Sequence, residues 1–292
     1  MQSPFKRIVV YDLETGGLKN KFNSITEIAM VAIDLETLSI VEETSIMLLP
    51  YLDLTNVNRD PKKEAIEIIK MIGEPDEDTG IKTVMFQGEK MTLKSYDQLA
   101  DEISAFQDYL DNNVKVIDYN EIVRLGDTEY CDIIDIYFDK SYNPEALEIT
   151  HISKEMLIEE GVTLEVASAK IQEVIKTNTI GNSKPILAGH NIKKFDNPFL
   201  EIFFQINKLE LWKLVNALII DTIEWARLKW FELPSFSLGG CADSVGLTLK
   251  NAHRALPDTV ANAKLLIKML KSLRGEGTQE NKYKRRKFTF NF

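Results

Sequence analysis

Two acidic residues follow the first apolar run of the sequence and share a spacing that suits metal binding. Residues 7–11 are mostly β-branched or aromatic and predict a buried strand, which Asp12 and Glu14 continue. Side chains at i and i+2 share one face of a strand, so these carboxylates would repel each other unless a cation lies between them. Their oxygen ligands suit Mg²⁺ or Mn²⁺. The alternative interpretation is a solvated strand end.

A histidine and an aspartate stand close together near the end of the chain. His253 precedes Asp258 by five positions, and Pro257 suits the first turn of a helix predicted over residues 257–273. The helix dipole supports a negative charge in that turn, and an imidazole can accept a proton near neutral pH. Taken alone, this aspartate could equally be a helix cap.

A third acidic position lies between these two segments. Asp196 follows a short strand predicted over residues 185–188 and precedes a helix predicted over residues 198–207. Taken alone, it is typical of an N-cap aspartate. The position gains meaning only in combination with the other acidic residues.

The three segments together resemble the DEDDh family of 3′→5′ exonucleases, which belongs to the RNase H-like superfamily and includes proofreading exonucleases, RNase T and oligoribonuclease. The resemblance covers residues 5–50 and 142–272, with accessory matches that begin at Asn143 and Ile220. It implies an α/β fold of three layers, with a mixed central sheet of about five strands flanked by helices. The matching stretches are Asp12-Leu-Glu-Thr-Gly-Gly-Leu18, Gly189-His-Asn-Ile-Lys-Lys-Phe-Asp196 and His253-Arg-Ala-Leu-Pro-Asp258.

The resemblance also implies a catalytic site with two divalent cations, Mg²⁺ or Mn²⁺. In that site Asp12 bridges the two metals, and Glu14 and Asp258 complete the position that holds the attacking water. Asp196 supports the second metal, directly or through water. His253 serves as the general base. Glu27 and Asp221 also match acidic positions of the family, and we expect them to have structural roles.

Residues at the end of the first motif and at the start of the second are candidates for contact with the substrate. Gly16 would let the backbone approach the terminal nucleotide closely, beside Thr15. By resemblance, Leu18 would pack against the terminal base, and His190 and Asn191 would line the same pocket. The alternative interpretation of Leu18 is a core residue.

The domain organisation departs from a minimal member of the family. Residues 1–50 and 142–274 are expected to form the exonuclease domain. Residues 51–141 are expected to form an inserted α+β subdomain, because helix and hairpin patterns and apolar residues favour a folded insert over a disordered loop. Within it we predict a helix over residues 61–73 and a strand over residues 133–138.

Charge and composition restrict the partners of the chain. The net charge of −10 argues against a protein that simply coats nucleic acid, although metals at the site would offset it. The tail over residues 275–292 is the exception, because it is basic and then aromatic. It could track a phosphate backbone or be a solvated end without a role. The two cysteines indicate no disulfide framework. Neither a signal peptide nor a membrane span is predicted, so we expect a cytoplasmic protein.

The leading hypothesis is an exonuclease that removes nucleotides from the 3′ end of DNA, either alone or as the proofreading activity of a polymerase. Its partners would then be nucleic acid with a free 3′ end and a DNA polymerase or another replication protein. RNA trimming by an exonuclease of the same family is the close alternative, because no residue reads the 2′-hydroxyl group unambiguously. A non-catalytic nucleic-acid-binding subunit is the alternative from another class.

Overall fold

The first three strands form an antiparallel meander that carries the first acidic motif. In the computed structural model these are β1 (Arg7–Thr15), β2 (Ile25–Asp34) and β3 (Ser39–Met47). Asp12 pairs with Ala29 of β2, and Glu14 pairs with Glu27. The structure describes residues 4–276, except 73, 76–81, 87–88, 93–95, 111–114 and 250–252. Most of the tail predicted over residues 275–292 therefore lies outside the described residues.

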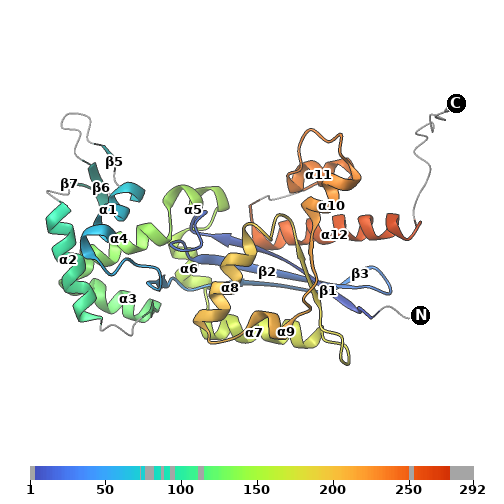
Figure 1. Cartoon of the computed structure of the whole chain (residues 1–292), viewed down its shortest axis with the longest axis horizontal. Coiled ribbons are helices and arrows are strands. Elements are labelled where there is room, and N and C mark those ends of the chain that lie inside the picture. Colours follow the sequence, from blue (N-terminus) through green and yellow to red (C-terminus); the bar gives the residue numbers. More distant parts are fainter. Residues whose placement is uncertain are drawn as a thin grey trace, which may run out of the picture.

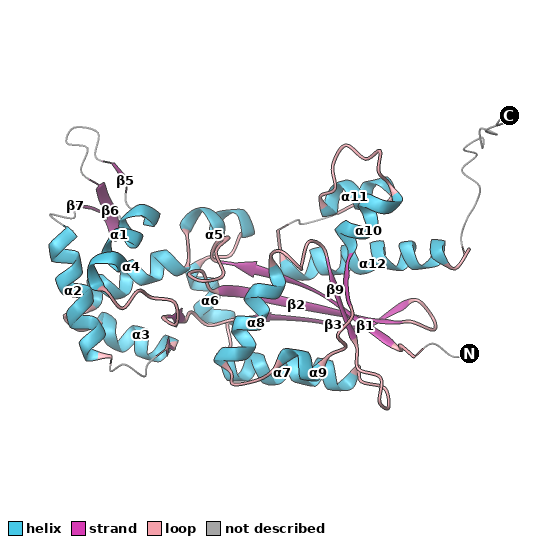
Figure 2. Ribbon diagram, in the orientation of Figure 1, coloured by secondary structure: helices cyan, strands magenta, loops and turns pink. Residues whose placement is uncertain are grey.

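Two short strands complete the sheet on the other side of β1. Strand β9 (Ile186–Gly189) pairs with β1 in parallel, and β10 (Ile219–Asp221) pairs with β9 in parallel. Within the described residues the order is β10-β9-β1-β2-β3, a mixed five-stranded sheet that confirms the prediction (Figures 1 and 2). Because β1, β9 and β10 are parallel, their carboxyl ends lie on the same side of the sheet, and the acidic motif of β1 lies at this side.

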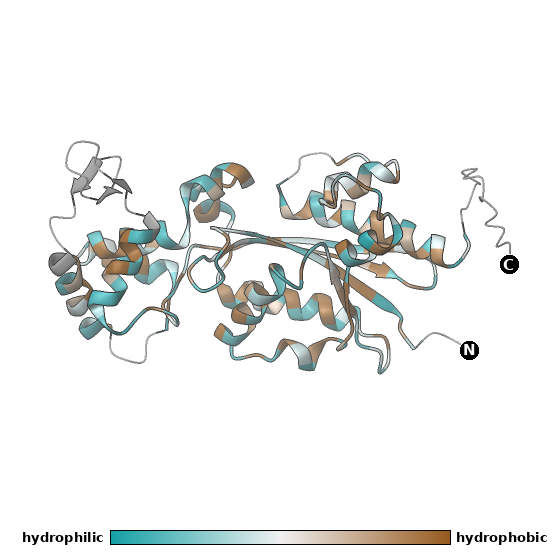
Figure 3. Cartoon of the chain, turned by 45° about the horizontal axis from the view of Figure 1, so that its top comes forward, coloured by the Kyte–Doolittle hydropathy of each residue, from teal (hydrophilic) through white to brown (hydrophobic). Residues whose placement is uncertain are grey.

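Helices cover both faces of the sheet, so the predicted three-layer arrangement is confirmed. Alternate residues of β1 face opposite sides. Ile8 and Val10 pack with the long helix α12 (Ala255–Leu273), whereas Val9 and Tyr11 pack in the larger cluster with α7 (Leu164–Thr177). Figure 3 shows the hydrophobic residues along the strands and in stripes on the helices. The other helices of this part are α5 (Pro144–Thr150), α6 (Lys154–Glu160), α8 (Asp196–Ile206), α9 (Leu211–Leu214), α10 (Thr222–Lys229) and α11 (Leu238–Ser244).

The block between β3 and α5 lies at one end of the sheet, on the left in Figure 1. It has its own hydrophobic cluster, around buried residues such as Ile68, Ile103, Phe106 and Ile134. The same cluster includes Leu157 of α6, so this core extends beyond the predicted boundary at residue 141. The elements of the block are β4 (Leu52–Asp53), α1 (Pro61–Ile72), β5 (Glu74–Pro75), β6 (Lys82–Phe86), β7 (Glu89–Thr92), α2 (Tyr96–Tyr109), β8 (Val116–Ile117), α3 (Tyr119–Gly126) and α4 (Cys131–Ser141).

One predicted element of this block is wrong. The strand expected over residues 133–138 lies inside helix α4. Its β-branched and aromatic residues favour a strand locally, but the buried positions Ile133, Ile136, Tyr137 and Lys140 recur every three to four residues, which is the helical period. Short apolar runs do not distinguish buried strands from buried helices, and packing inside the block decides here. No helix in the described part of the chain is long and apolar enough to cross a membrane.

Candidate active site

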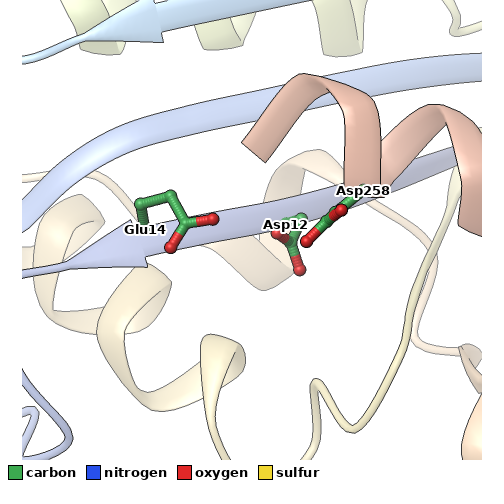
Figure 4. A group of neighbouring side chains, drawn as sticks. All are labelled: Asp12, Glu14 and Asp258. Carbon is green, nitrogen blue, oxygen red and sulfur yellow. The ribbon is translucent and has the colours of Figure 1, made fainter. Parts of the chain in front are cut away.

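Three carboxylates from two distant segments meet at the carboxyl end of β1. Asp12 and Glu14 project from the strand, and Asp258 projects from the first turn of α12 (Figure 4). One oxygen of each lies within 4.8 Å of the others, which makes this the group of the described residues that could hold a metal ion. The arrangement brings together three of the four carboxylates that the sequence predicts as ligands.

A buried glutamate fixes the start of α12 against the sheet. Glu27 of β2 is 3% exposed, and its Oε2 accepts hydrogen bonds from Arg254 Nε (3.1 Å) and from the backbone N–H of Ala255 (3.2 Å). Ser45 of β3 donates a hydrogen bond to the other oxygen at 2.6 Å. These contacts set where the first turn of α12 lies, and therefore where Asp258 lies. Glu27 thus has the structural role that was expected for it.

His253 is held next to Asp258 by its backbone. Its N–H donates to Asp258 Oδ2 at 3.1 Å, and its side chain is exposed on the turn before α12. The residue has φ of 68°, the left-handed region that a side chain other than glycine rarely adopts. Asp258 is a candidate metal ligand. The hydrogen bond to it therefore fixes the backbone of His253 close to the three carboxylates.

Asp196 contacts the strand segment that carries Asp12 and Glu14. It is 3% exposed at the start of α8, and its Oδ1 accepts the backbone N–H of Leu13 at 3.0 Å. Leu13 stands between Asp12 and Glu14, so this bond holds the acidic strand end against α8. This position of Asp196 is compatible with support of a metal through a water molecule, one of the two possibilities that the resemblance implies.

The acidic group is electrostatically unfavourable when every member is ionised. Burial, with repulsion from Asp258 as the next cause, raises the pKa of Glu14 to about 8. Burial also raises the pKa of Asp12 well above its usual range, with Asp196 and Glu14 adding to the effect. The pKa of Asp196 rises to about 7, again mainly through burial. Bound cations would relieve this repulsion.

An unpaired acceptor shows that the residues fit a metal. Oδ1 of Asp258 is buried and has no hydrogen-bond partner among the described residues. A buried carboxylate oxygen without a partner is costly, and a hard cation beside Asp12 and Glu14 would satisfy it. The all-oxygen donor set fits Mg²⁺ or Mn²⁺ better than a softer ion.

A cavity of about 370 Å³ opens beside Glu14. Leu18 lines it and is 84% exposed, which excludes the interpretation of this residue as part of the core. Ile149 of α5 and Phe195 line it as well, and the sequence motifs did not point to Ile149. Thr15 also borders the cavity, and its hydroxyl donates to the carbonyl of Gly17 at 2.7 Å. A space of this size beside Glu14, lined by both apolar and polar side chains, suits a nucleobase.

Gly16 serves packing in this structure. A Cβ on Gly16 would lie 2.1 Å from the carbonyl oxygen of Ser141 at the end of α4. The N–H of Gly16 donates to Ser24 O at 2.8 Å, and its carbonyl accepts from Asn143 N at 2.7 Å. Both backbone groups therefore bind the protein itself, whereas the sequence suggested an approach to the nucleotide. The glycine is needed because the loop after β1 touches the connection between α4 and α5.

His190 and Asn191 do not line the cavity beside Glu14. The Nε2 of His190 lies 2.8 Å from the carbonyl oxygen of Phe236, so Nε2 donates there, and Nδ1 lies 2.9 Å from Thr222 Oγ1. Burial lowers the pKa of His190, which favours the neutral ring. Asn191 N donates to Asp221 Oδ1 at 2.8 Å. The two residues anchor the segment that leads to Asp196 onto α10, and Asp221 has the structural role expected for it.

Comparison with known proteins identifies the family. The exonuclease family RNase T matches residues 120–266, half of the chain, in a range that contains Asp196, His253 and Asp258 and begins after Asp12. The 3′-5′ exonuclease DinG of Staphylococcus epidermidis is 30% identical over 159 residues, 52% of this chain and 16% of that protein. The PolC-type DNA polymerase III of Bacillus subtilis is 32% identical over 133 residues, 46% of this chain and 8% of that protein. The chain thus spans a small part of these relatives.

Solved structures share the fold at low sequence identity. E. coli Exonuclease I in complex with a dT13 oligonucleotide superposes with a TM-score of 0.53 at 14% identity, over 92% of this chain and 42% of that chain. A 3′-exonuclease described in recognition of the histone mRNA stem-loop superposes with a TM-score of 0.53 at 12% identity, over 93% and 84% of the two chains. The RNase H-like fold of the exonucleases is therefore confirmed, and the chain belongs to the RNase T exonuclease family.

Proposed function

We propose that this chain is a metal-dependent 3′→5′ exonuclease that hydrolyses phosphodiester bonds at the 3′ end of DNA by a two-metal mechanism. The observation that carries the proposal is the meeting of Asp12, Glu14 and Asp258 beside a cavity, with one buried oxygen of Asp258 unpaired. Family membership supports the same reaction class.

The site residues have two proposed tasks. Asp12, Glu14 and Asp258 would hold the cations, and Asp196 would support them directly or through a water. When bound, the two cations would neutralise charge on the phosphate and on the attacking and leaving oxygens. Carboxylates beside bound cations would be weak bases, because the positive charge lowers their affinity for a proton. His253 is the remaining candidate for that task.

His253 accepts the proton of the attacking water on its imidazole. The new P–O bond forms as the bond from phosphorus to the 3′ oxygen of the preceding nucleotide breaks, and that oxygen takes a proton from solvent. The exposed ring can exchange its proton with water after each turnover, because the turn before α12 leaves it open to solvent. General-base assistance of this type contributes about 10²–10⁴-fold to rate.

The cavity beside Glu14 is the proposed site of the terminal nucleotide. Leu18 and Ile149 both line this cavity and offer apolar surface to the base, and both are largely exposed in the protein without substrate. Exposed apolar side chains around a cavity are a common mark of a binding site. We therefore keep the packing of the terminal base with Leu18, add Ile149 and Phe195 to it, and do not include His190 and Asn191 in the lining of this cavity.

DNA is the proposed substrate in preference to RNA. One group of relatives consists of DNA polymerases, which supports DNA and is consistent with a DNA polymerase or another replication protein as partner. The fold alone does not choose, because the structural neighbours include both a protein bound to DNA and one described with mRNA.

Paired digestion tests the proposal. Single-stranded DNA and RNA of the same sequence, each labelled at the 5′ end, are incubated with Mg²⁺, with Mn²⁺ or with EDTA. We expect a ladder that shortens from the 3′ end of DNA, faster than for RNA, and no products in EDTA or with the Asp12→Ala variant. Faster digestion of RNA would transfer the assignment to RNA trimming, and intact polymers in every lane would refute the exonuclease proposal.

A further inference from the structure

A second and larger cavity, of about 580 Å³, lies between the exonuclease fold and the block over residues 51–141. Three parts of the chain border it. The loop between β1 and β2 contributes Lys21, the end of the β4–β8 pair contributes Lys115 and Val116, and the carboxyl-terminal half of α8 contributes Ile202 and Ile206 with Lys208 beyond it. We refer to this cavity as the lysine cleft.

The charge of the lysine cleft differs from that of the whole chain. Lys21, Lys115 and Lys208 are exposed, and each comes from a different one of the three parts. Asp53 is the acidic residue of the lining, so the described lining sums to +2, three lysines less one aspartate, in a chain of net charge −10. None of the three ammonium groups forms an ion pair within the described residues. The cleft is therefore complementary to an anion.

The floor of the lysine cleft is apolar. Val116, Ile202 and Ile206 are half-buried, and Val116 and Ile206 pack against the main hydrophobic cluster of the sheet. Cations at the rim above an apolar floor suit a single strand of nucleic acid, whose phosphates and unpaired bases can contact the two at once. A duplex would offer phosphates to the rim but no unpaired base to the floor.

The lysine cleft and the cavity at the carboxylates lie along the same two elements. Gly17 and Leu18 line the catalytic cavity, and Asn20 and Lys21 of the same loop line the cleft. Phe195, directly before α8, lines the cavity beside Glu14, whereas Ile202 lies six residues after Asp196, about 9 Å further along the helix. A strand whose terminal base lies beside Leu18 would enter the cleft within a few nucleotides.

We propose that the lysine cleft binds the single-stranded segment that leads to the 3′ end, with Lys21, Lys115 and Lys208 contacting its phosphates. The proposal rests on the proposed exonuclease function and assigns a role to the inserted block, because Lys115 and Val116 belong to that block. The block then forms one wall of the path that the substrate follows. An acidic protein segment would match the charge, but it lacks the continuity with the catalytic cavity that a substrate strand has.

Binding measurements with a matched control test the lysine cleft. In the Asp12→Asn background with Mg²⁺, the Kd of a 20-nucleotide thymidine strand labelled at the 5′ end is measured by fluorescence anisotropy over a range of salt concentrations. The test variant is Lys21→Gln/Lys115→Gln/Lys208→Gln. The control is Lys170→Gln/Lys176→Gln/Lys264→Gln, which removes three exposed lysines from α7 and α12.

The test variant should bind the 20-mer about tenfold more weakly than the control, with a log–log salt slope flatter by about 2, since each contact to a single strand contributes about 0.7. The loss of affinity of the test variant should be smaller for a trinucleotide, which would occupy only the cavity beside Glu14. An unchanged slope would overturn the proposal, as would equal losses for the two lengths. Equal competition by a polyglutamate peptide of matched charge would overturn it in favour of an acidic protein partner.

The assay separates this proposal from the exonuclease proposal. Binding is measured without cleavage. If the test variant has a flatter salt slope but the cleavage-competent protein digests no polymer, the lysine cleft would be supported and the exonuclease proposal refuted. In the cleavage-competent protein the same substitutions should lower the ratio of kcat/KM for the 20-mer to that for a dinucleotide about tenfold. A ratio equal to that of the control would show that the cleft takes no part in substrate binding.

Discussion

His253 is the residue at which the proposed metal binding and the proposed proton transfer would meet. Its backbone N–H donates to Asp258 Oδ2 and its side chain is exposed, so the residue would couple the position of the proposed base to that of the proposed ligand. The backbone of His253 has φ of 68°, which costs energy that the contacts of α12 must offset. Strain of this kind is often found at functional sites, and it agrees with the role proposed for this residue.

The first prediction concerns this imidazole. His253→Asn should lower kcat by about 10²–10⁴-fold while Mn²⁺ binding, followed by electron paramagnetic resonance, is retained. Asparagine is chosen because it tolerates the left-handed conformation. His151→Asn is the matched control, since His151 is also exposed and has φ of 55° at the end of α5. Turnover of His253→Asn equal to that of the control would refute the general-base assignment.

Leu18 allows a similar test at the cavity. Leu18→Ala should raise KM for a single strand about tenfold with little change in Tm, because an exposed side chain contributes little to stability but offers apolar area to the terminal base. Leu228→Ala is the control, since Leu18 and Leu228 are both 84% exposed and Leu228 lies on α10. Equal KM values in steady-state kinetics would count against a base-packing role of Leu18.

Helix α4 of the inserted block contacts the loop between β1 and β2, which borders the candidate site. The end of α4 presents the carbonyls of Lys140 and Ser141, which accept hydrogen bonds from Asn23 Nδ2 (2.9 Å) and Ser24 N (3.1 Å). A buried ion pair between Lys140 and Glu64, with 2.5 Å between nitrogen and oxygen, ties α4 to α1. The loop that carries Leu18 therefore depends on the block for its position.

Gly16→Ala tests this dependence. The added methyl group would lie 2.1 Å from the backbone of Ser141, so α4 and the loop must move apart, at about 1–3 kcal/mol of unfolding free energy measured in urea. KM should rise as well, because the loop shifts. Gly126→Ala in α3 is the control, since a Cβ there meets nothing within 4 Å. If the Gly16 variant were as stable as the control, the contact would not constrain the loop.

Elements with a local pattern could be predicted from the sequence, and elements decided by packing could not. The meander and the short buried strands before Asp196 and Asp221 follow from apolar runs that end in polar turns. The helix over Cys131–Ser141 was missed because its β-branched residues favour a strand until the packing of the block is known. The extension of the block's core into α6 depends on contacts that no local pattern records.

The same division holds within the candidate site. Spacing placed Asp12 and Glu14 on one face of a strand, but local patterns left Asp258 open as a helix cap. Only the resemblance to the DEDDh family implied that Asp258 meets the other two carboxylates, which the structure brings together. The hydrogen bonds of His190 could not, because its partners Thr222 and Phe236 lie 32 and 46 positions away and one of them is a backbone carbonyl. The exposed side chain of Ile149 has no reactive or polar group, so only its position beside the cavity identifies it as a candidate for substrate contact.

At the scale of the whole molecule, the acidic site opposes folding when no cation is bound. The pKa of Glu14 is about 8 and that of Asp196 about 7, both raised mainly by burial, whereas unfolded carboxyls titrate near 4. A carboxyl whose pKa is raised by folding stabilises the protein fully below its unfolded pKa, and this contribution is lost as pH rises through the folded pKa. The stability of the metal-free protein should therefore fall between about pH 5 and about pH 8.

This linkage gives the last prediction. In EDTA, Tm should fall as pH rises across this window, whereas Mg²⁺ should raise Tm more at pH 8 than at pH 6, because cations bind the ionised carboxylates. Glu14→Gln should flatten the EDTA profile, since it removes one of the titrating groups, and should reduce the effect of Mg²⁺. Glu36→Gln, which removes an exposed acid outside the site, is the control. Scanning calorimetry of the wild type and the two variants at four pH values measures these profiles. A Glu14→Gln profile that coincides with the control would show that the acidic site is not what makes the metal-free protein sensitive to pH.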